Sequence, residues 1–181
     1  MWIGLVGSEM CIRDSRQPGS AFKPFVYLAA LDRGYSPATR ILDAPFVIDQ
    51  GPGLGKWKPA NYTKKFYGPS AMRIGIEKSR NLMTVRLART IGMKAVANYA
   101  YKFDIMANMP EQLSMSLGAG ETTLMKLTAA YAMLVNGGKQ IRPTFIDRIQ
   151  DRNGKTIFNQ EERICSAWNR RVESRSGVPQ V

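Results

Sequence analysis

The sequence predicts an α+β protein in which several helices precede an antiparallel hairpin. Between residues 20 and 135, apolar side chains recur at the three- and four-residue spacing of amphipathic helices, whereas residues 144–150 alternate apolar and polar side chains as a strand does. The 181 residues are 44% hydrophobic and 22% charged, which is the composition of a folded domain. We therefore expect one packed domain whose helices come first and whose sheet comes late.

The first helix is expected after the turn Pro18-Gly19, with Ser20 at its N-cap and its end near Gly34. Pro24 fits this helix because it falls in the first turns. Phe25, Leu28, Ala29 and Asp32 follow one another at the spacing i, i+3, i+4 and i+7 and so form one stripe along this helix. We expect the apolar residues of the stripe to face a core.

Residues 40–67 carry Pro, Gly and aromatic side chains with short extended runs such as 46–48, so we expect an ordered but irregular segment. Helices return after it, and the first two of them are separated by the break Ser79-Arg80-Asn81. These helices are expected at residues 70–78, 82–91 and 93–101.

A further helix is predicted from Thr122 or Thr123, as N-cap, to Val135. Asn136-Gly137-Gly138 closes it, because these residues readily adopt the left-handed geometry of a C-cap. Its buried stripe is expected to consist of Leu124, Leu127, Ala130, Tyr131 and Leu134.

After the helices, a strand at 144–150, the turn Asn153-Gly154 and a return strand at 155–158 predict a hairpin. A two-stranded sheet is too small to be stable alone, so we expect the chain to be a fragment of a longer protein. The start of the chain lacks any periodicity, and its end is rich in Arg and Ser. The expected organisation is a non-native leader, a partial domain and a loop-like tail, at residues 1–15, 16–160 and 161–181.

The composition excludes several kinds of site. There is no histidine, so neither a Ser-His-Asp triad, nor a Cys-His dyad, nor an imidazole zinc site can form within this chain. Cys11 and Cys165 lack metal-knuckle spacing, and we expect no metal and no cofactor. The net charge of +12 favours polyanions such as nucleic acid, anionic lipid or cell-wall polymer without choosing among them. Neither a membrane span nor an export signal is predicted at residues 1–7.

Ser20 and Lys23 are the candidate nucleophile and base. At i and i+3 their side chains share one face of a helix start. A serine hydroxyl attacks poorly until its proton is removed, and without histidine a lysine of lowered pKa can remove it. This S-x-x-K spacing is common by chance, but it occurs once here.

Ser79 and Asn81 supply a second hydroxyl and a carboxamide at the break between two helices. Such short side chains usually cap backbone groups. They can also project into a cleft, where the amide orients a substrate amide and the hydroxyl relays a proton. The order S-x-x-K then S-x-N favours the catalytic interpretation.

These motifs, with three longer stretches, resemble the transpeptidase domain of bifunctional class A penicillin-binding proteins, the 1A type most of all. The stretches are residues 16–24 (RQPGSAFKP), 57–62 (WKPANY) and 118–123 (GAGETT), and the resemblance runs from about residue 16 to 160. It implies the fold of penicillin-binding proteins and serine β-lactamases, with the helical subdomain largely present and the main antiparallel sheet incomplete.

The resemblance also implies a reaction. Ser20 would be the acylated nucleophile, Lys23 its general base, Ser79 the proton relay and Asn81 a substrate-orienting residue. The implied partners are peptidoglycan stem peptides, with a D-Ala-D-Ala donor and an amine acceptor, and β-lactams that acylate the same serine. Nucleic acid is not an expected partner. The implied location is the bacterial inner membrane, with the catalytic domain on the periplasmic side of an anchor absent from these residues.

The sequence departs from the family because it contains no Lys-Thr-Gly or Lys-Ser-Gly. Gly154-Lys155-Thr156 lies at the predicted hairpin turn and is interpreted as a chance match. We expect the isolated chain to be unstable and inactive, since the missing strand supplies an oxyanion donor in the family and part of the core sheet.

Three alternatives stay open. A serine β-lactamase would share Ser20 and Lys23 but needs a deacylating glutamate, which is not evident. A basic nucleic-acid-binding module is favoured by the charge but not by its scattered placement. A sensing or scaffolding protein of the same fold would be acylated without cross-linking peptidoglycan.

Overall fold

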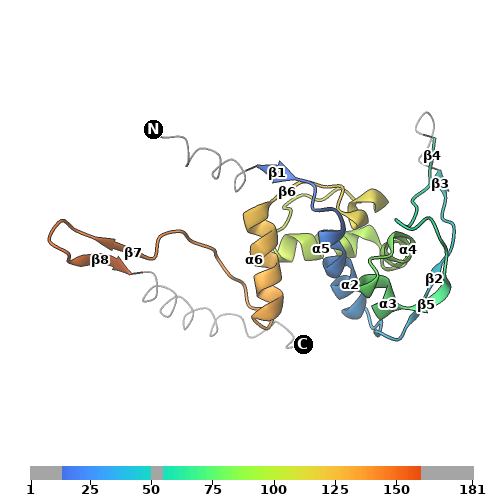
Figure 1. The fold of residues 1–181 in the computed structure, drawn as a ribbon, viewed down its shortest axis with the longest axis horizontal. Helices are drawn as coiled ribbons and strands as arrows, with labels where there is room; N and C mark the ends of the chain where they lie inside the picture. Colours follow the sequence, from blue (N-terminus) through green and yellow to red (C-terminus); the bar gives the residue numbers. More distant parts are fainter. Residues whose placement is uncertain (1–13, 50–54, 160–181) are drawn as a thin grey trace. The chain divides into compact units, whose positions relative to one another are not determined.

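The computed structural model of the chain describes residues 14–49 and 55–159, which divide into two units at residue 141 (Figure 1). Both the expected leader and the expected tail lie almost wholly outside the described residues. The first unit contains two short 3-10 helices, η1 (Gly19–Phe22) and η2 (Leu113–Leu117). Its α-helices are α2 (Lys23–Leu31), α3 (Met72–Glu77), α4 (Asn81–Ile91), α5 (Met93–Lys102) and α6 (Leu124–Val135).

Short antiparallel strand pairs complete the first unit. They are β1 (Ser15–Arg16) with β6 (Thr122–Thr123), β2 (Arg40–Asp43) with β5 (Gly68–Ala71), and β3 (Ile48–Asp49) with β4 (Lys56–Trp57). The segment expected to be irregular therefore contains paired strands, while residues 50–54 lie outside the described part. Helices with short antiparallel strands confirm the α+β prediction.

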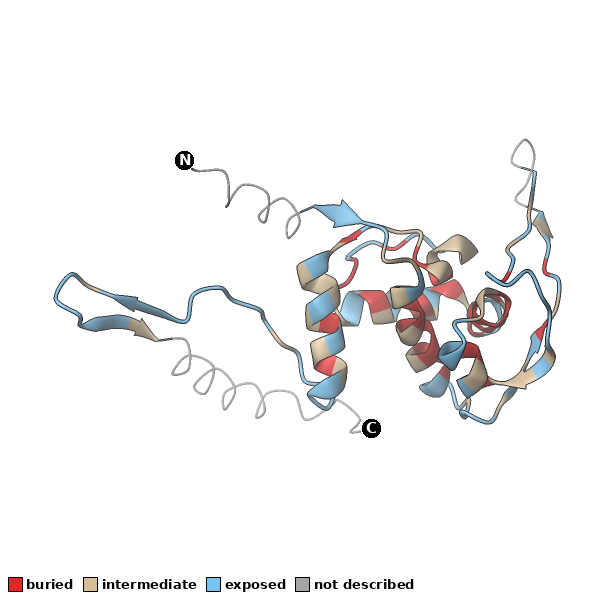
Figure 2. Cartoon of the chain, viewed as in Figure 1, coloured by how far each residue is buried: buried red, intermediate tan, exposed pale blue. Residues whose placement is uncertain are grey.

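Helix α2 lies at the centre of the core and packs against α4 and α5 (Figure 2). Phe25 on α2 is completely buried, and its ring meets those of Phe103 and Tyr131 edge-on, with centroids 5.2 and 5.6 Å away. Such edge-to-face pairs add to the free energy gained from burying the rings. The predicted stripe of α2 is right for its apolar members, since Phe25 and Ala29 are buried and Leu28 packs against the core, but burial extends around most of this helix.

The predicted helices are found with shifted ends. The helix expected from residue 70 begins only at Met72, because residues 68–71 pair with β2 as strand β5. Asn81, expected in the break, is the first residue of α4. The break itself is real, since Ser79 adopts φ 51° and Arg80 is extended.

Helix α6 begins as predicted, because the Thr123 hydroxyl accepts a hydrogen bond from the Lys126 amide at 3.2 Å. Its predicted buried stripe is partly wrong. Leu124 is 58% exposed and Tyr131 is 36% exposed, whereas Met133, outside the predicted stripe, is buried with Ala130. Tyr131 lies at the edge of the core, where its ring packs against Phe25 and its hydroxyl donates to the Ala21 carbonyl at 2.8 Å.

The second unit contains the predicted hairpin, formed by β7 (Arg148–Gln150) and β8 (Thr156–Asn159). Its turn includes Gly154 at φ 82°, and the Asp151 carboxylate accepts the amides of Asn153 and Lys155 at 2.8 and 2.9 Å. These bonds fix the turn locally, as expected for Asp and Asn-Gly in a hairpin.

Candidate active site

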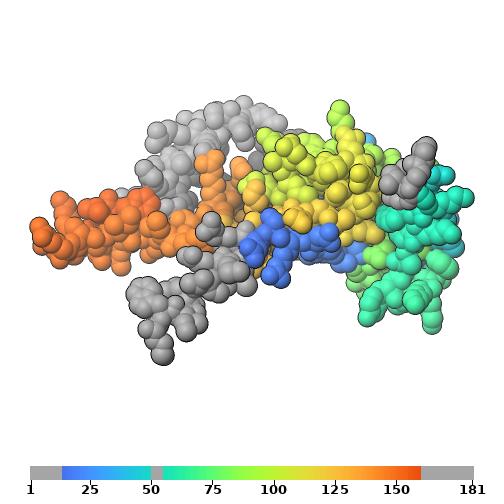
Figure 3. Space-filling model, turned by 90° about the horizontal axis from the view of Figure 1, so that it is seen from above, coloured from blue at the N-terminus to red at the C-terminus, as the bar shows by residue number. Residues whose placement is uncertain are grey.

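Ser20 lies in η1, directly after the turn that brings the chain into helix α2. The serine is exposed, and within the described residues its hydroxyl makes no hydrogen bond. A backbone hydrogen bond holds this turn close to residues 118–123, because the Gly19 amide donates to the Gly118 carbonyl at 3.1 Å. In Figure 3 the segment that leads into Ser20 (blue) lies against residues near 115–125 (yellow). The exposed hydroxyl therefore sits on a turn anchored by neighbouring backbone.

Lys23 begins helix α2 and is only 2% exposed. Its ammonium donates three hydrogen bonds across the α2–α4 contact. The acceptors are the Ser79 carbonyl at 2.7 Å, the Ser79 hydroxyl at 2.9 Å and the Asn81 Oδ1 at 2.6 Å. Three acceptors match the three N–H bonds of an ammonium group. The structure thus brings together three of the four side chains that the sequence singled out.

Ser79 and Asn81 reach Lys23 because the chain turns sharply between α3 and α4. Ser79 has φ 51°, a left-handed conformation that is unfavourable for residues other than glycine. Asn81 uses both ends of its carboxamide: Oδ1 accepts from Lys23, and Nδ2 donates to the Ala60 carbonyl at 2.8 Å. The amide orientation is therefore fixed by one donor and one acceptor.

Burial lowers the pKa of Lys23 to about 8 from its usual 10.5, because a charged ammonium loses hydration inside the protein. At that pKa roughly a tenth of the amine is neutral at pH 7, against about one part in three thousand for an ordinary lysine. A neutral amine can accept a proton. Lys23 therefore combines a lowered pKa with a place one helical turn after Ser20 along the chain, which makes it the candidate base for this hydroxyl.

Several residues next to this cluster had no predicted role. Ala60 and Asn61 belong to the stretch 57–62, whose match to the family motif was the available signal. Asp43, at the end of β2, is completely buried and accepts hydrogen bonds from Asn61 and Arg80. No pattern in the sequence distinguished this aspartate, since its partners lie 18 and 37 positions away.

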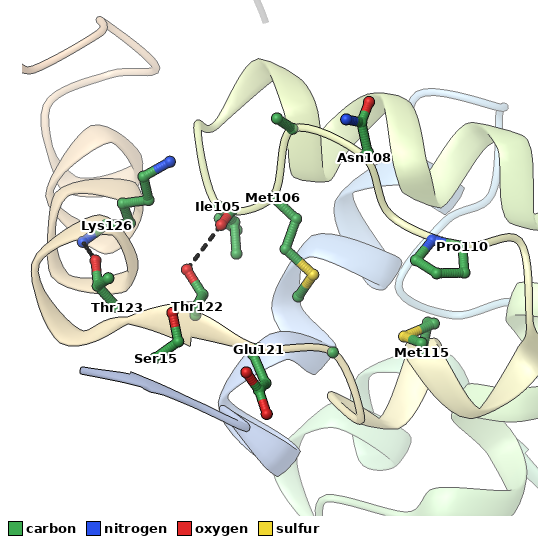
Figure 4. A pocket seen from close by; sticks show the side chains of 12 residues that line it. Ser15, Ile105, Met106, Asn108, Pro110, Met115, Glu121, Thr122, Thr123 and Lys126 are labelled. Carbon is green, nitrogen blue, oxygen red and sulfur yellow. Dashed lines mark hydrogen bonds between the residues drawn. The ribbon is translucent and has the colours of Figure 1, made fainter. Parts of the chain in front are cut away.

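A depression of about 560 Å³ occurs elsewhere in the first unit (Figure 4). Its lining includes Met106, Met115, Glu121 and Lys126, and the Thr122 hydroxyl donates to the Ile105 carbonyl at its wall at 2.7 Å. None of Ser20, Lys23, Ser79 and Asn81 lines it. The hydrogen bonds around Lys23, and not this depression, identify the candidate site.

Among residues 14–49 and 55–159, no three His, Cys, Asp or Glu side chains gather closely enough to hold a metal ion. The helices in the same part of the chain are all too short or too polar to cross a lipid bilayer. Lys155, in the sequence Gly-Lys-Thr, lies in the hairpin turn of the second unit.

Residues 8–172 match the family model of the penicillin binding protein transpeptidase domain. Penicillin-binding protein 1A of Rickettsia bellii is 49% identical over 154 residues, covering 85% of this chain and 20% of the relative. The crystal structure of penicillin-binding protein 1A from Haemophilus influenzae matches 82% of this chain and 22% of its own, with 33% identity and a TM-score of 0.77. A structure of PonA1 from Mycobacterium tuberculosis in complex with penicillin V shares the fold, with 23% identity and a TM-score of 0.74 over 84% of this chain and 43% of its own.

The chain spans about a fifth of the curated relative's length. The family match covers most of the 181 residues and includes both the Ser20–Lys23 turn and the Ser79–Asn81 break. The chain belongs to the penicillin-binding protein transpeptidase family.

Proposed function

We propose that this chain carries the acylation centre of a peptidoglycan D,D-transpeptidase, with Ser20 as nucleophile and Lys23 as general base. The observation that carries the proposal is the buried Lys23 amine, which donates to Ser79 and Asn81 and lies one helical turn after the exposed Ser20. A lysine of lowered pKa that follows an exposed serine by one helical turn fits serine activation without histidine.

In the first step the Ser20 oxygen attacks the carbonyl carbon of the penultimate D-alanine of a stem peptide. The hydroxyl proton passes to the neutral Lys23 amine. The carbon–nitrogen bond then breaks, and the departing D-alanine nitrogen receives a proton. Ser79 is suited to deliver it, because a hydroxyl both accepts from Lys23 and donates onward, whereas a carbonyl or Asn81 Oδ1 can only accept.

In the second step the amine of a neighbouring peptidoglycan strand attacks the acyl ester. A new amide forms, and Ser20 recovers its proton. Splitting one amide exchange into two steps lowers each barrier. Asn81 orients the substrate amide in both steps, since its carboxamide is held by Lys23 and the Ala60 carbonyl. β-lactams would acylate the same serine, as the penicillin V complex of PonA1 suggests by its fold likeness.

We place this domain on the periplasmic side of the bacterial inner membrane, where the polymer substrate is found. The 181 residues contain no Lys-Thr-Gly, which in the family completes the site. We therefore expect acylation in the full-length protein that contains this chain, and none in the isolated chain.

Labelling with a fluorescent penicillin tests this function. The full-length protein should be labelled on the peptide that contains Ser20, as located by mass spectrometry, and Ser20→Ala should remove the label. Ser36→Ala, in an exposed turn, is the matched control and should be labelled normally. If Ser20→Ala retained the label, Ser20 would not be the nucleophile. If the isolated chain became labelled, the expectation that it is inactive would be wrong.

Two product assays on the full-length protein distinguish a transpeptidase from a hydrolase. With a donor stem peptide and an amine acceptor, a transpeptidase releases D-alanine and forms the cross-linked peptide. A serine β-lactamase would turn over a chromogenic cephalosporin many times per enzyme and form no cross-link.

A further inference from the structure

The turn that carries Ser79 and Asn81 is held by a second set of contacts centred on Asp43. This aspartate ends strand β2 and is completely buried. Its Oδ2 accepts from the Arg80 guanidinium at 2.9 Å, and its Oδ1 accepts from the Asn61 amide at 2.8 Å. Both carboxylate oxygens are therefore used by residues that surround the candidate site.

Arg80, between Ser79 and Asn81, is restrained along its whole length. Its side chain is 13% exposed, and its guanidinium lies 3.6 Å from the centre of the Tyr67 ring. Its amide donates to the Gly75 carbonyl at 2.8 Å, and its carbonyl accepts from the Thr84 hydroxyl at 2.8 Å. A guanidinium paired with a buried carboxylate and stacked on an aromatic ring has little freedom to move.

Asn61 extends these contacts to the other side of Asn81. Its Oδ1 accepts from the amide of Leu82, which would otherwise be an unpaired donor at the start of helix α4. The preceding carbonyl, of Ala60, accepts from Asn81 Nδ2. Asn81 is therefore restrained from three directions. Arg80 before it binds Asp43, Leu82 after it binds Asn61, and its own Nδ2 binds the carbonyl of the residue that precedes Asn61.

We propose that Asp43 is a positioning residue that, through Arg80 and Asn61, holds Ser79 and Asn81 against Lys23. The inference rests on the proposed function of that site. Ser79 occupies an unfavourable left-handed conformation, which persists only where neighbouring contacts enforce it. Asp43 supplies the only carboxylate among the contacts described for Arg80, so its removal leaves a largely shielded guanidinium without its counter-charge.

The expected consequence is kinetic. A displacement of about 1 Å in a catalytic group can lower a rate about a hundredfold. In the full-length protein, Asp43→Asn should therefore lower the first-order rate constant of penicillin acylation about a hundredfold. The dissociation constant of the preceding non-covalent complex should change by less than about threefold, because the Asp43 side chain is completely buried and out of reach of a ligand. Stopped-flow measurements over a range of penicillin concentrations separate the two constants.

Arg86→Gln is the matched control. Arg86 lies in helix α4, and its guanidinium anchors the chain just after Asp43 by donating to the carbonyls of Ala44 and Pro45 at 3.2 and 2.7 Å. None of its described contacts reaches Ser79 or Asn81. This variant should lower the unfolding midpoint but keep the acylation rate constant within about twofold. An equal loss of acylation in Arg86→Gln would overturn the proposal, because general loosening would then explain it.

Rescue provides the second comparison. Arg80→Gln leaves Asp43 buried without its cation and should also slow acylation about a hundredfold. The double variant Asp43→Asn, Arg80→Gln restores a neutral hydrogen-bonded pair and should recover to within about tenfold of the wild-type rate. If Asp43→Asn does not fold, Arg80→Gln and the double variant carry the same comparison. A double variant slowed by the product of the single effects would overturn the proposal.

The two proposals fail in different ways. Without labelling of the wild-type protein, the proposed function fails and this inference with it. Normal acylation by folded Asp43→Asn, in a wild-type protein that labels on Ser20, would refute the positioning role alone.

Discussion

Helices α2 and α6 each contain mostly apolar residues and one lysine, yet their surroundings differ. In α2, six of the nine residues are buried, including Lys23. In α6, only two of the twelve are buried, and Lys126 forms an ion pair with Asp104 in which the two side chains are 42% and 63% exposed. Apolar composition therefore does not determine burial; the elements packed around the helix do.

The difference matters chemically, because a lysine is neutral often enough near pH 7 to accept a proton only where its charged form is destabilised. α4 and the Ser79 turn cover Lys23, so its ammonium is dehydrated and its pKa falls to about 8. Lys126 donates to a carboxylate at the surface, where water solvates both charges. Replacing each lysine in turn is the strongest way to test this comparison.

Lys23→Met in the full-length protein should lower the rate of penicillin acylation by about 10²- to 10⁴-fold, the usual contribution of a general base. Lys126→Met, the control, should acylate at the wild-type rate. The wild-type rate should rise with pH and level off above about 8, since the neutral amine is the reactive form and deprotonation follows the lowered pKa. A wild-type profile that is flat between pH 6 and 9 would contradict a base role for Lys23.

Stability should follow the same division. Phe25→Ala on α2 removes a fully buried ring that meets Phe103 and Tyr131, and should lower the free energy of unfolding by about 3–5 kcal/mol. Leu124→Ala on α6, where the leucine is 58% exposed, should change it by less than about 1 kcal/mol. Urea unfolding of the transpeptidase domain in the full-length protein measures both. Similar losses for the two variants would show that α6 is covered as fully as α2.

The sequence predicts local features of this comparison better than distant ones. The i, i+3 spacing of Ser20 and Lys23, the Thr123 N-cap and the Asn153-Gly154 turn depend on neighbouring residues, so their patterns are visible in the sequence. The exposure of Leu124 depends on which elements cover α6. The spacing alone says nothing of the contact between Lys23 and Ser79, which are 56 positions apart, and the resemblance supplied that expectation.

The role of Asp43 was not predicted for the same reason, because its contacts are with residues distant in the sequence. An aspartate at the end of a short strand is ordinarily solvated, and only the fold brings Arg80 and Asn61 to its two oxygens. The match at 57–62 marked Asn61 without indicating its partner. Family motifs thus pointed to residues of the candidate site, whereas the contacts that hold these residues required the three-dimensional structure.

The smallest expected effect concerns the glycines at the two helices. Gly118 has φ 76°, and a Cβ there would lie 2.1 Å from the Gly19 carbonyl oxygen at the turn before α2. Gly138, after α6, has φ 79° and open space around the same position. Both alanine variants therefore carry the backbone strain of a left-handed residue, about 1 kcal/mol, but only Gly118→Ala adds a clash with backbone.

Gly118→Ala should consequently lower the free energy of unfolding by about 1–3 kcal/mol more than Gly138→Ala, the usual range for forcing an extra carbon into a packed site. It should also slow acylation, because the Gly19–Gly118 contact sets the turn that carries Ser20. Urea unfolding and penicillin labelling of the two variants in the full-length protein measure these differences. If Gly118→Ala and Gly138→Ala were equally stable and equally labelled, the turn could shift away from residue 118 without moving the serine hydroxyl. The close approach of Gly19 and Gly118 would then not position the nucleophile.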